Sequence, residues 1–224
     1  MKKHFFKLFF ATSILFALTS CNNQKTNEEP LVVDEVSEEV ETTQYVIDID
    51  NSTMNWEGYK PLLRTTHTGL ISLKEGKFDL KDDKVVAGVF VIDMKSIEVT
   101  DLEGEYKENL EAHLMGTVEG KEDDFFNVNE FPTAEFSATG TSSKDGKTYL
   151  VGDLTLRGKT QEVGFPVEIN KIEDGLVEIV SEPFKIDRTK WDIKFASKSF
   201  FDNLGENFVG DDMQIEFKIV AKQI

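Results

Sequence analysis

The sequence predicts an all-β fold, an antiparallel sandwich or barrel of about eight strands with one inserted α-helix. Three observations lead to this prediction. Short segments alternate apolar and polar side chains along most of the chain after residue 43, which is the period of half-buried strands. Glycines such as Gly146, Gly158, Gly175 and Gly210 separate these segments, as they do in antiparallel sheets. A single stretch, residues 102–115, has the period of a helix instead.

Composition indicates one acidic domain. A chain of 224 residues with 39% hydrophobic content and 18 phenylalanines can bury one large core without a second domain. Its formal net charge of −17 would repel phosphate backbones, which argues against a nucleic-acid partner.

The first twenty residues have the features of a secretory signal peptide. Lys2, Lys3 and Lys7 form a basic start, and a mainly apolar run follows from residue 8 to residue 18. This run is shorter than the roughly 20 residues that a spanning helix needs. We therefore predict a cleavable leader over residues 1–20.

Cys21 follows this leader and is the single cysteine of the chain. The tetrapeptide Leu18-Thr19-Ser20-Cys21 resembles the lipobox of bacterial lipoproteins, in which the cysteine thiol is acylated. We therefore predict a lipidated Cys21 that anchors the protein in the cell envelope, in a periplasmic or outer-membrane-facing position. Residues 22–43 carry seven acidic side chains against one lysine, so residues 21–43 are predicted to be the anchor and a disordered tether, and residues 44–224 the folded domain.

The predicted strands begin directly after the tether. Residues 45–58 alternate around a break at Asn51-Ser52, and residues 70–80 suggest two short pieces around Glu75-Gly76. Residues 85–94 are apolar on both faces, so we expect both faces to be covered. Further strand patterns occupy residues 133–141, 149–156, 162–169, 176–186 and 213–221.

The one helical pattern places Leu102, Tyr106, Leu110 and Leu114 at steps of four residues. Such a stripe predicts an amphipathic helix over residues 102–115, with Asp101 as the N-terminal cap.

A phenylalanine-rich segment, residues 123–136, comes shortly after this helix. Its last third alternates Ala134 and Phe136 with polar residues and predicts a strand, whereas Phe125 and Phe126 have no regular period. These two rings must therefore cover apolar surface from a loop, as expected at the lip of a cavity. An aromatic plug in an ordinary core is the alternative. We expect the helix and this loop to lie together across one end of a barrel.

No pattern of catalytic or metal-ligating residues emerges. His67 and His113 cannot by themselves form a zinc site, and we expect His113 to be a packing or capping residue. The sequence has no P-loop, no nucleophile elbow and no calcium loop, so we predict a protein that is not an enzyme, with no catalytic residues. An enzymatic alternative would rely on Asp93 and Asp153, the strand carboxylates that could face a barrel interior.

Several motifs in order resemble the YceI-like family, including its members that are lipoproteins in Bacteroidetes-type bacteria. The match extends from about residue 44 to the end of the chain. The matching motifs are Val46-Ile47-Asp48, Trp56, Thr68-Gly69, Gly76-Lys77-Phe78, 91–97, Leu110-Glu111-Ala112-His113-Leu114, Asp124-Phe125-Phe126, 131–136, 152–158, Trp191-Asp192-Ile193 and 197–201.

This resemblance implies an extended lipocalin-like antiparallel barrel whose tunnel binds a polyisoprenoid chain, such as a quinone tail or a prenyl carrier lipid, without catalysis. No cofactor is implied beyond such a bound lipid. The expected ligand-binding residues are the apolar members of the matched motifs, with two residues added on strand alternation alone: Phe90, Ile92, Phe125, Phe126, Phe136, Leu154, Leu156, Phe165 and Phe217.

Three cationic or titratable residues, Arg64, His67 and Arg157, could contact a lipid head group at the mouth of the tunnel. An interaction or structural module with a side-chain-filled barrel remains the alternative function. Glycines on the predicted strands, Gly88 and Gly152 among them, favour a hollow interior but can also mark bends.

Overall fold

The structure is a computed structural model that describes residues 41–224. The predicted signal peptide, the lipidated Cys21 and the tether up to residue 40 lie outside the described residues. The folded part belongs to one compact unit, Val40–Ile224. All the strands, both core clusters and the cavity described below lie within this unit, so it contains what an independently folding domain needs.

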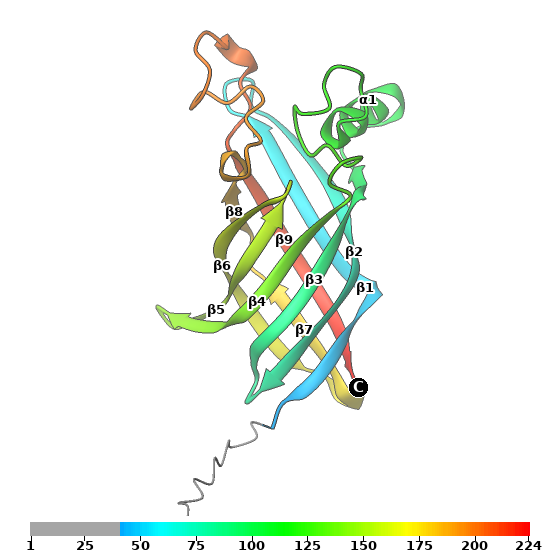
Figure 1. The fold of residues 1–224 in the computed structure, drawn as a ribbon, viewed down its shortest axis with the longest axis vertical. Helices are drawn as coiled ribbons and strands as arrows, with labels where there is room; N and C mark the ends of the chain where they lie inside the picture. Colours follow the sequence, from blue (N-terminus) through cyan, green and yellow to red (C-terminus); the bar gives the residue numbers. More distant parts are fainter. Residues whose placement is uncertain (1–40) are drawn as a thin grey trace, which may run out of the picture. The chain divides into compact units, whose positions relative to one another are not determined.

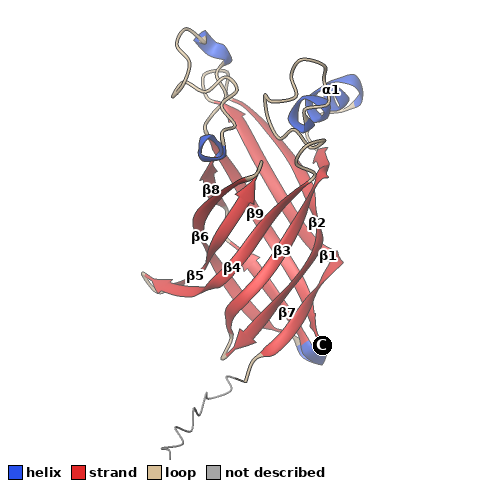
Figure 2. Ribbon diagram, in the orientation of Figure 1, coloured by secondary structure: helices blue, strands red, loops and turns tan. Residues whose placement is uncertain are grey.

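The unit is a closed antiparallel β-barrel of eight strands (Figures 1 and 2), which confirms the predicted fold class. The strands follow one another around the barrel in chain order, and pairing between β1 and β9 closes it. The short β8 follows β7 after Glu182 and Pro183, and each pairs with its own part of β9, so β7 and β8 share one position and the nine strand segments make an eight-stranded barrel. The strands are β1 (Thr43–Lys60), β2 (Thr65–Lys81), β3 (Lys84–Val99), β4 (Thr133–Lys144), β5 (Lys147–Leu156), β6 (Lys159–Lys171), β7 (Leu176–Ser181), β8 (Phe184–Asp187) and β9 (Asp212–Gln223).

One α-helix, α1 (Gly104–Met115), and three short 3-10 helices complete the described part of the chain: η1 (Glu173–Gly175), η2 (Arg188–Trp191) and η3 (Gly205–Asn207). Helix α1, the phenylalanine-rich loop after it and the segment between β8 and β9 lie at the same end of the barrel (Figure 1). We call this the helix end. None of the described helices is long and apolar enough to cross a membrane.

Strand alternation follows the sequence pattern. Ala134 and Phe136 of β4 are buried, as predicted. In β1, Tyr45 and Ile47 are buried, a register shift follows between Asp48 and Thr53, and Met54 then packs against the core. Because the shift adds residues to one strand of the pair, the buried positions change from odd to even numbers.

Two strand predictions were wrong. The predicted pair of pieces around Glu75-Gly76 is one continuous strand, β2, because register shifts near Ser72 and Leu73 absorb the irregularity without ending the pairing. The predicted single strand 176–186 is broken between β7 and β8 at Pro183, which has no N–H for a ladder.

The expected covering of both faces of residues 85–94 was also wrong. Val85 and Phe90 point inward and are buried, but Val86 is 37% exposed on the other face. A barrel closes upon itself, so its outer face needs no second layer. The apolar residues of this face are shielded only by neighbouring side chains.

The helix departs from its predicted pattern. It begins at Gly104, its cap position is Glu103, and no side chain caps it. Asp101 instead bonds to Thr68 and His67 of β2. No residue of α1 is buried and Tyr106 is 77% exposed. The helix lies at the end of the barrel, so only part of its predicted stripe meets protein.

The opposite end of the barrel, which we call the closed end, is filled by side chains. Tyr45, Phe78, Leu80 and Val85 are each at most 4% exposed. The rings of Tyr45 and Phe78 stack with centroids 5.4 Å apart, and Phe78 stacks on Phe90 at 5.9 Å. Such offset aromatic pairs add stability beyond the burial of area.

Candidate ligand-binding cavity

The half of the barrel nearer the helix end encloses a cavity of about 440 Å³, within the usual range for small-molecule sites. Most of its wall is apolar. All nine residues predicted from the sequence to bind ligand line it: Phe90, Ile92, Phe125, Phe126, Phe136, Leu154, Leu156, Phe165 and Phe217. Their place on the wall is a fact of the structure, and their contact with a ligand stays a prediction.

The cavity stops before the closed end. Leu150 and Ile219 line it, whereas Phe78, Leu80 and Val85 do not. The glycines near this level provide no space. A Cβ added at Gly88 would lie 2.7 Å from the Cβ of Phe78, and one at Gly152 would lie 2.9 Å from the Phe136 ring. These glycines allow aromatic side chains to approach the sheet and leave no empty space of their own. The barrel is therefore filled in the half at the closed end and hollow in the half at the helix end.

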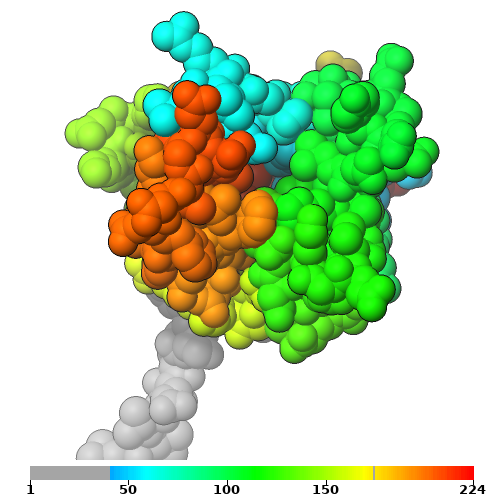
Figure 3. Space-filling model, turned by 90° about the horizontal axis from the view of Figure 1, so that it is seen from above, coloured from blue at the N-terminus to red at the C-terminus, as the bar shows by residue number. Residues whose placement is uncertain are grey.

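Three segments surround the mouth of the cavity at the helix end. They are the hairpin between β1 and β2, helix α1 with its following loop, and the segment between β8 and β9. Viewed from above, they surround a recess (Figure 3). The first contributes Tyr59 and Lys60 to the lining, the second Leu110 and Leu114, and the third Val209 and other residues.

The phenylalanine-rich loop is held firmly against the helix. The Phe126 N–H donates to the Leu114 carbonyl at 3.0 Å, and the Val128 N–H to the Met115 carbonyl at 2.9 Å. Phe125 is 8% exposed and both rings line the cavity. The two rings thus line the cavity from a loop, and they also pack in a core cluster, so both sequence interpretations of this pair describe part of their environment.

His113 links this loop to the opposite side of the mouth. Its Nε2 lies 2.7 Å from Asp124 Oδ2, and its ring meets Phe125 and Phe195 edge-on, with centroids 5.1 and 4.9 Å away. The predicted packing role is confirmed, and His113 also lines the cavity.

His67 lines the cavity mouth and bonds to Asp101, with 2.9 Å between Nδ1 and Oδ2. Asp101 also accepts the Thr68 N–H at 2.9 Å. Burial by itself would raise the pKa of Asp101, but the bonds from Thr68 and His67 outweigh it and lower the pKa below the ordinary 3.8.

The two predicted arginines, Arg64 and Arg157, do not line the cavity. Arg64 is exposed in the turn between β1 and β2, and Arg157 binds Asp123 with 2.9 Å between Nη2 and Oδ1. Neither lines the cavity, so this geometry gives no support to a head-group role for them. The carboxylates of the enzymatic alternative, Asp93 and Asp153, do not line it either.

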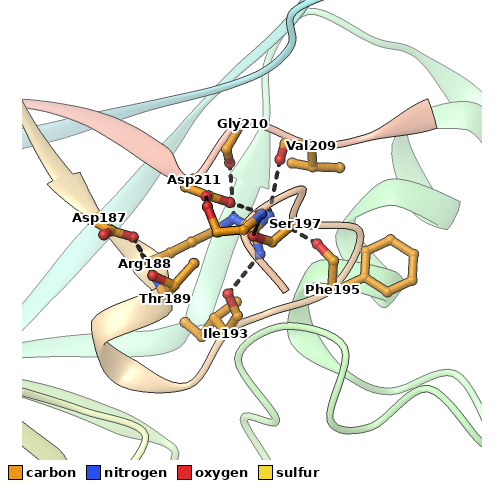
Figure 4. A network of polar contacts seen from close by, with 10 residues as sticks. Asp187, Arg188, Thr189, Ile193, Phe195, Ser197, Val209, Gly210 and Asp211 are labelled. Carbon is orange, nitrogen blue, oxygen red and sulfur yellow. Dashed lines mark hydrogen bonds and ion pairs between the residues drawn. The ribbon is translucent and has the colours of Figure 1, made fainter. Parts of the chain in front are cut away.

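The structure reveals a residue that the sequence analysis missed, Arg188. Its side chain is 1% exposed and lines the cavity. The guanidinium donates to backbone carbonyls across the segment between β8 and β9 (Figure 4), and its carbon lies 6.0 Å from the Phe125 ring centroid. The bonds are Nε to Gly210 at 2.9 Å, Nη1 to Ile193 at 2.7 Å, and Nη2 to Phe195 at 2.9 Å and Val209 at 3.2 Å.

Arg188 thus holds one wall of the cavity in place. Burial lowers the pKa of its guanidinium, and the nearby Asp211 and Asp187 carboxylates oppose that change. Because its acceptors are backbone carbonyls distributed over 18 residues, from Ile193 to Gly210, no residue pattern in the sequence could have indicated them.

The cavity thus offers a mainly apolar interior with polar groups near its mouth. Within residues 41–224, no cluster of histidine and acidic side chains could hold a metal ion. Such a site can remove an elongated apolar molecule from water and leave one polar end near the mouth.

Comparison with known proteins identifies the family of this chain and solved structures with the same fold. The family model described as YceI-like domain matches residues 45–221. No curated protein matches the chain. Its fold is shared by solved structures that include the following two. A polyisoprenoid-binding domain from Saccharophagus degradans, at 12% identity and a TM-score of 0.54, covers 80% of this chain and 98% of its own. BcnA from Burkholderia cenocepacia, at 21% identity and a TM-score of 0.54, covers 79% of this chain and 99% of its own.

Proposed function

Because the chain belongs to the YceI-like domain family, we propose that its barrel binds an elongated isoprenoid lipid and carries or stores it at a membrane. The observation that supports this most directly is the cavity of about 440 Å³ with its mainly apolar wall. The domain from Saccharophagus degradans, which has the same fold, is described as polyisoprenoid-binding.

Binding would be driven by burial of the isoprenoid chain. Removing apolar area from water contributes about 25 cal/mol per Å², reduced by the cost of ordering and association. The closed end stops the chain, so the lipid would enter tail first. Its head group would stay near His67 and Lys60, which line the mouth. No chemical step is needed for this function.

We also propose that the protein is a lipoprotein of the Bacteroidetes type, anchored through Cys21 in the cell envelope. The support is the leader and the lipobox-like tetrapeptide ending at Cys21. Cells given a clickable fatty acid should label the wild-type chain and should leave Cys21→Ser unlabelled. Equal labelling of both chains would contradict the anchor.

The proposed lipid binding is tested by native mass spectrometry of the unit 40–224, purified without denaturation, with extraction and identification of the bound molecule. We expect a stoichiometric isoprenoid. Leu154 lines the cavity, so Leu154→Trp should fill it and lower the occupancy at least about tenfold.

Val151→Trp is the matched control, because Val151 lies on the same strand and alternates with the inward Leu150 and Gly152. It should retain the lipid. Circular dichroism shows whether each variant is folded. An empty wild-type chain that also refuses added prenyl lipids would refute the proposal and favour the interaction module with no small ligand.

A further inference from the structure

The rim of the cavity carries apolar side chains that face water. Leu62 and Leu63, at the tip of the β1–β2 hairpin, are 58% and 44% exposed, and Phe200 and Phe201, between β8 and β9, are 50% and 49% exposed. We call these four residues the apolar rim. They come from segments 137 residues apart in the sequence (Leu63 to Phe200), and both segments lie at the helix end (Figure 1).

The two parts of the apolar rim belong to segments that touch each other. The Gly210 N–H donates to the Tyr59 carbonyl at 2.8 Å. A Cβ at Gly210 would lie 2.8 Å from the Tyr59 ring, so the absence of a side chain allows this contact. Tyr59, Lys60 and Gly210 also line the cavity. The apolar rim therefore stands beside the mouth.

These residues are unusual for their positions. Tight turns usually carry Gly, Pro, Asn, Asp or Ser, yet Leu62 and Leu63 occupy a turn and contribute to neither core cluster. Phe200 and Phe201 are held by N–H bonds to the Ser197 carbonyl at 3.2 and 3.0 Å. These bonds hold the backbone beneath the two rings, and exposed apolar side chains that gather in one region are typical of an interaction surface.

The charge of the same region differs from that of the chain. The formal net charge of the protein is −17, but residues 59–64 carry Lys60 and Arg64 and no acidic residue. Beside the phenylalanines, the Lys194 ammonium lies 4.7 Å from the Phe200 ring centroid, and Lys198 lies over Phe208. Asp202 and Glu206 offset the charge of this second segment, so the net positive charge belongs to the hairpin.

We propose that the apolar rim docks the mouth of the cavity onto the surface of a lipid bilayer that contains anionic lipid. Leucine and phenylalanine side chains enter the boundary between head groups and acyl chains, and Lys60 and Arg64 meet the anionic head groups. This inference rests on the proposed function, because docking would bring the mouth to the layer from which an isoprenoid enters or leaves. The cap residue Glu103 and the first turns of helix α1, with Glu105 and Glu108, would lie on the side of the mouth that the anionic lipid repels.

Vesicle flotation tests the docking with the unit 40–224, which lacks Cys21 and therefore any acyl anchor. The vesicles contain phosphatidylcholine and phosphatidylglycerol in equal parts. We expect the wild-type unit to float with them. Leu62→Ser with Leu63→Ser, and separately Phe200→Ser with Phe201→Ser, should each reduce binding at least about tenfold, because each pair removes apolar area that would enter the membrane.

Matched controls separate the rim from exposed apolar surface in general. Val46 and Ile49 are each 40% exposed on β1, away from the hairpin, and Val46→Ser with Ile49→Ser should leave flotation unchanged. Lys60→Gln with Arg64→Gln should weaken it severalfold and reduce its sensitivity to salt, whereas Lys81→Gln with Lys84→Gln at the β2–β3 turn should not. Circular dichroism confirms folding of each variant.

The inference is overturned if the wild-type unit fails to float, which would make a protein the partner to seek, or if rim and control variants lose binding equally. Native mass spectra of the same rim variants report cavity occupancy independently, and we expect it to be unchanged. If the wild-type unit floats and the rim variants do not, but no isoprenoid is bound, the proposed function is refuted and the docking stands. If isoprenoid is bound but the rim variants float as well as the wild type, the docking is refuted and the proposed function stands.

Discussion

At the residue scale, Arg188 is the buried charged side chain of the cavity wall. Its guanidinium is almost fully buried and serves four backbone carbonyls. Arginine offers five donors in a rigid planar fork, and a lysine ammonium cannot reach the same set of acceptors. The residue therefore stabilises a segment that has little regular secondary structure of its own.

Replacing Arg188 by lysine should lower the free energy of unfolding by about 3 kcal/mol, because buried carbonyls lose a charged donor. Urea unfolding followed by circular dichroism measures the change. Arg64→Lys, in an exposed turn, should change stability by less than about 0.5 kcal/mol. Equal stability of Arg188→Lys and the wild type would show that water replaces the lost bonds.

The lowered pKa of Asp101 leads us to predict how the free energy of unfolding changes with pH. Its pKa is lower in the folded protein than the ordinary 3.8, so the unfolded state binds more protons in this range. The carboxylate therefore stabilises the fold above about pH 4 and loses this effect as pH falls through the folded pKa.

Asp101→Asn should accordingly lower the free energy of unfolding near neutral pH by at most about 1 kcal/mol, since the pair is close to the surface. The difference from the wild type should shrink as the pH falls below 3.8. Urea titrations across this range measure it, with the exposed Asp50→Asn as control. A difference that grows on acidification would contradict the assignment.

At the element scale, the end of helix α1 positions the phenylalanine-rich loop. Gly116 has φ +70 in the left-handed region, and its N–H bonds to carbonyls of the last turn. A Cβ there would lie 2.4 Å from the Glu122 carbonyl oxygen. The glycine thus ends the helix and lets the loop that carries Phe125 and Phe126 fold back against it.

Gly116→Ala should therefore cost more stability than Gly120→Ala. Both glycines have positive φ, but a Cβ at Gly120 would meet nothing within 4 Å. We expect about 1 kcal/mol for Gly120→Ala from backbone strain, and clearly more for Gly116→Ala. Thermal unfolding gives both values, and equal losses would mean that the loop moves aside without cost.

At the scale of the whole molecule, the barrel divides into a filled half and a hollow half, which predicts different costs for the same substitution. Phe78 is 1% exposed at the closed end, and Phe136 lines the cavity. Phe78→Ala should cost about 3–5 kcal/mol, as for an ordinary core phenylalanine. Phe136→Ala should cost less, because a ring beside empty space has fewer contacts to lose.

Lipid occupancy should show the opposite order. Phe136→Ala should weaken isoprenoid binding, and Phe78→Ala, where it remains folded, should not. Urea unfolding and native mass spectrometry of the two variants provide the comparison. A larger stability loss for Phe136→Ala would mean that this half of the barrel is packed like a core.

Much of the fold could be predicted because alternation is a local property. The buried Ala134 and Phe136 follow from the period of two residues along one strand, and the irregular Phe125-Phe126 pair indicated a lip. Seven of the nine apolar wall residues depended in addition on the family resemblance, since a period of two does not say which face points inward; Phe165 and Phe217 were added on alternation alone.

Other features could not be predicted from local patterns. The apolar run of β3 suggested two covered faces, but curvature into a barrel left Val86 in water. The helical period suggested burial for Tyr106, yet its side chain is 77% exposed, and only the later part of the stripe, Leu110 and Leu114, meets protein. Asp101 resembled a helix cap but bonds to a neighbouring strand instead, because long-range contacts can outweigh local propensity.

The sequence by itself thus determined most of the strands, the presence of the helix and the acidic character of the chain, and it predicts the envelope leader, because each depends on residues close together in the chain. Only the tertiary structure decided that the barrel is closed, hollow in one half and flanked at its mouth by the apolar rim. These properties depend on pairs such as Tyr45 with Gln223 and on the carbonyls, up to 22 residues away in the chain, to which Arg188 donates. Their geometry exists only after the chain has folded, since long-range pairing sets the volume that side chains must fill.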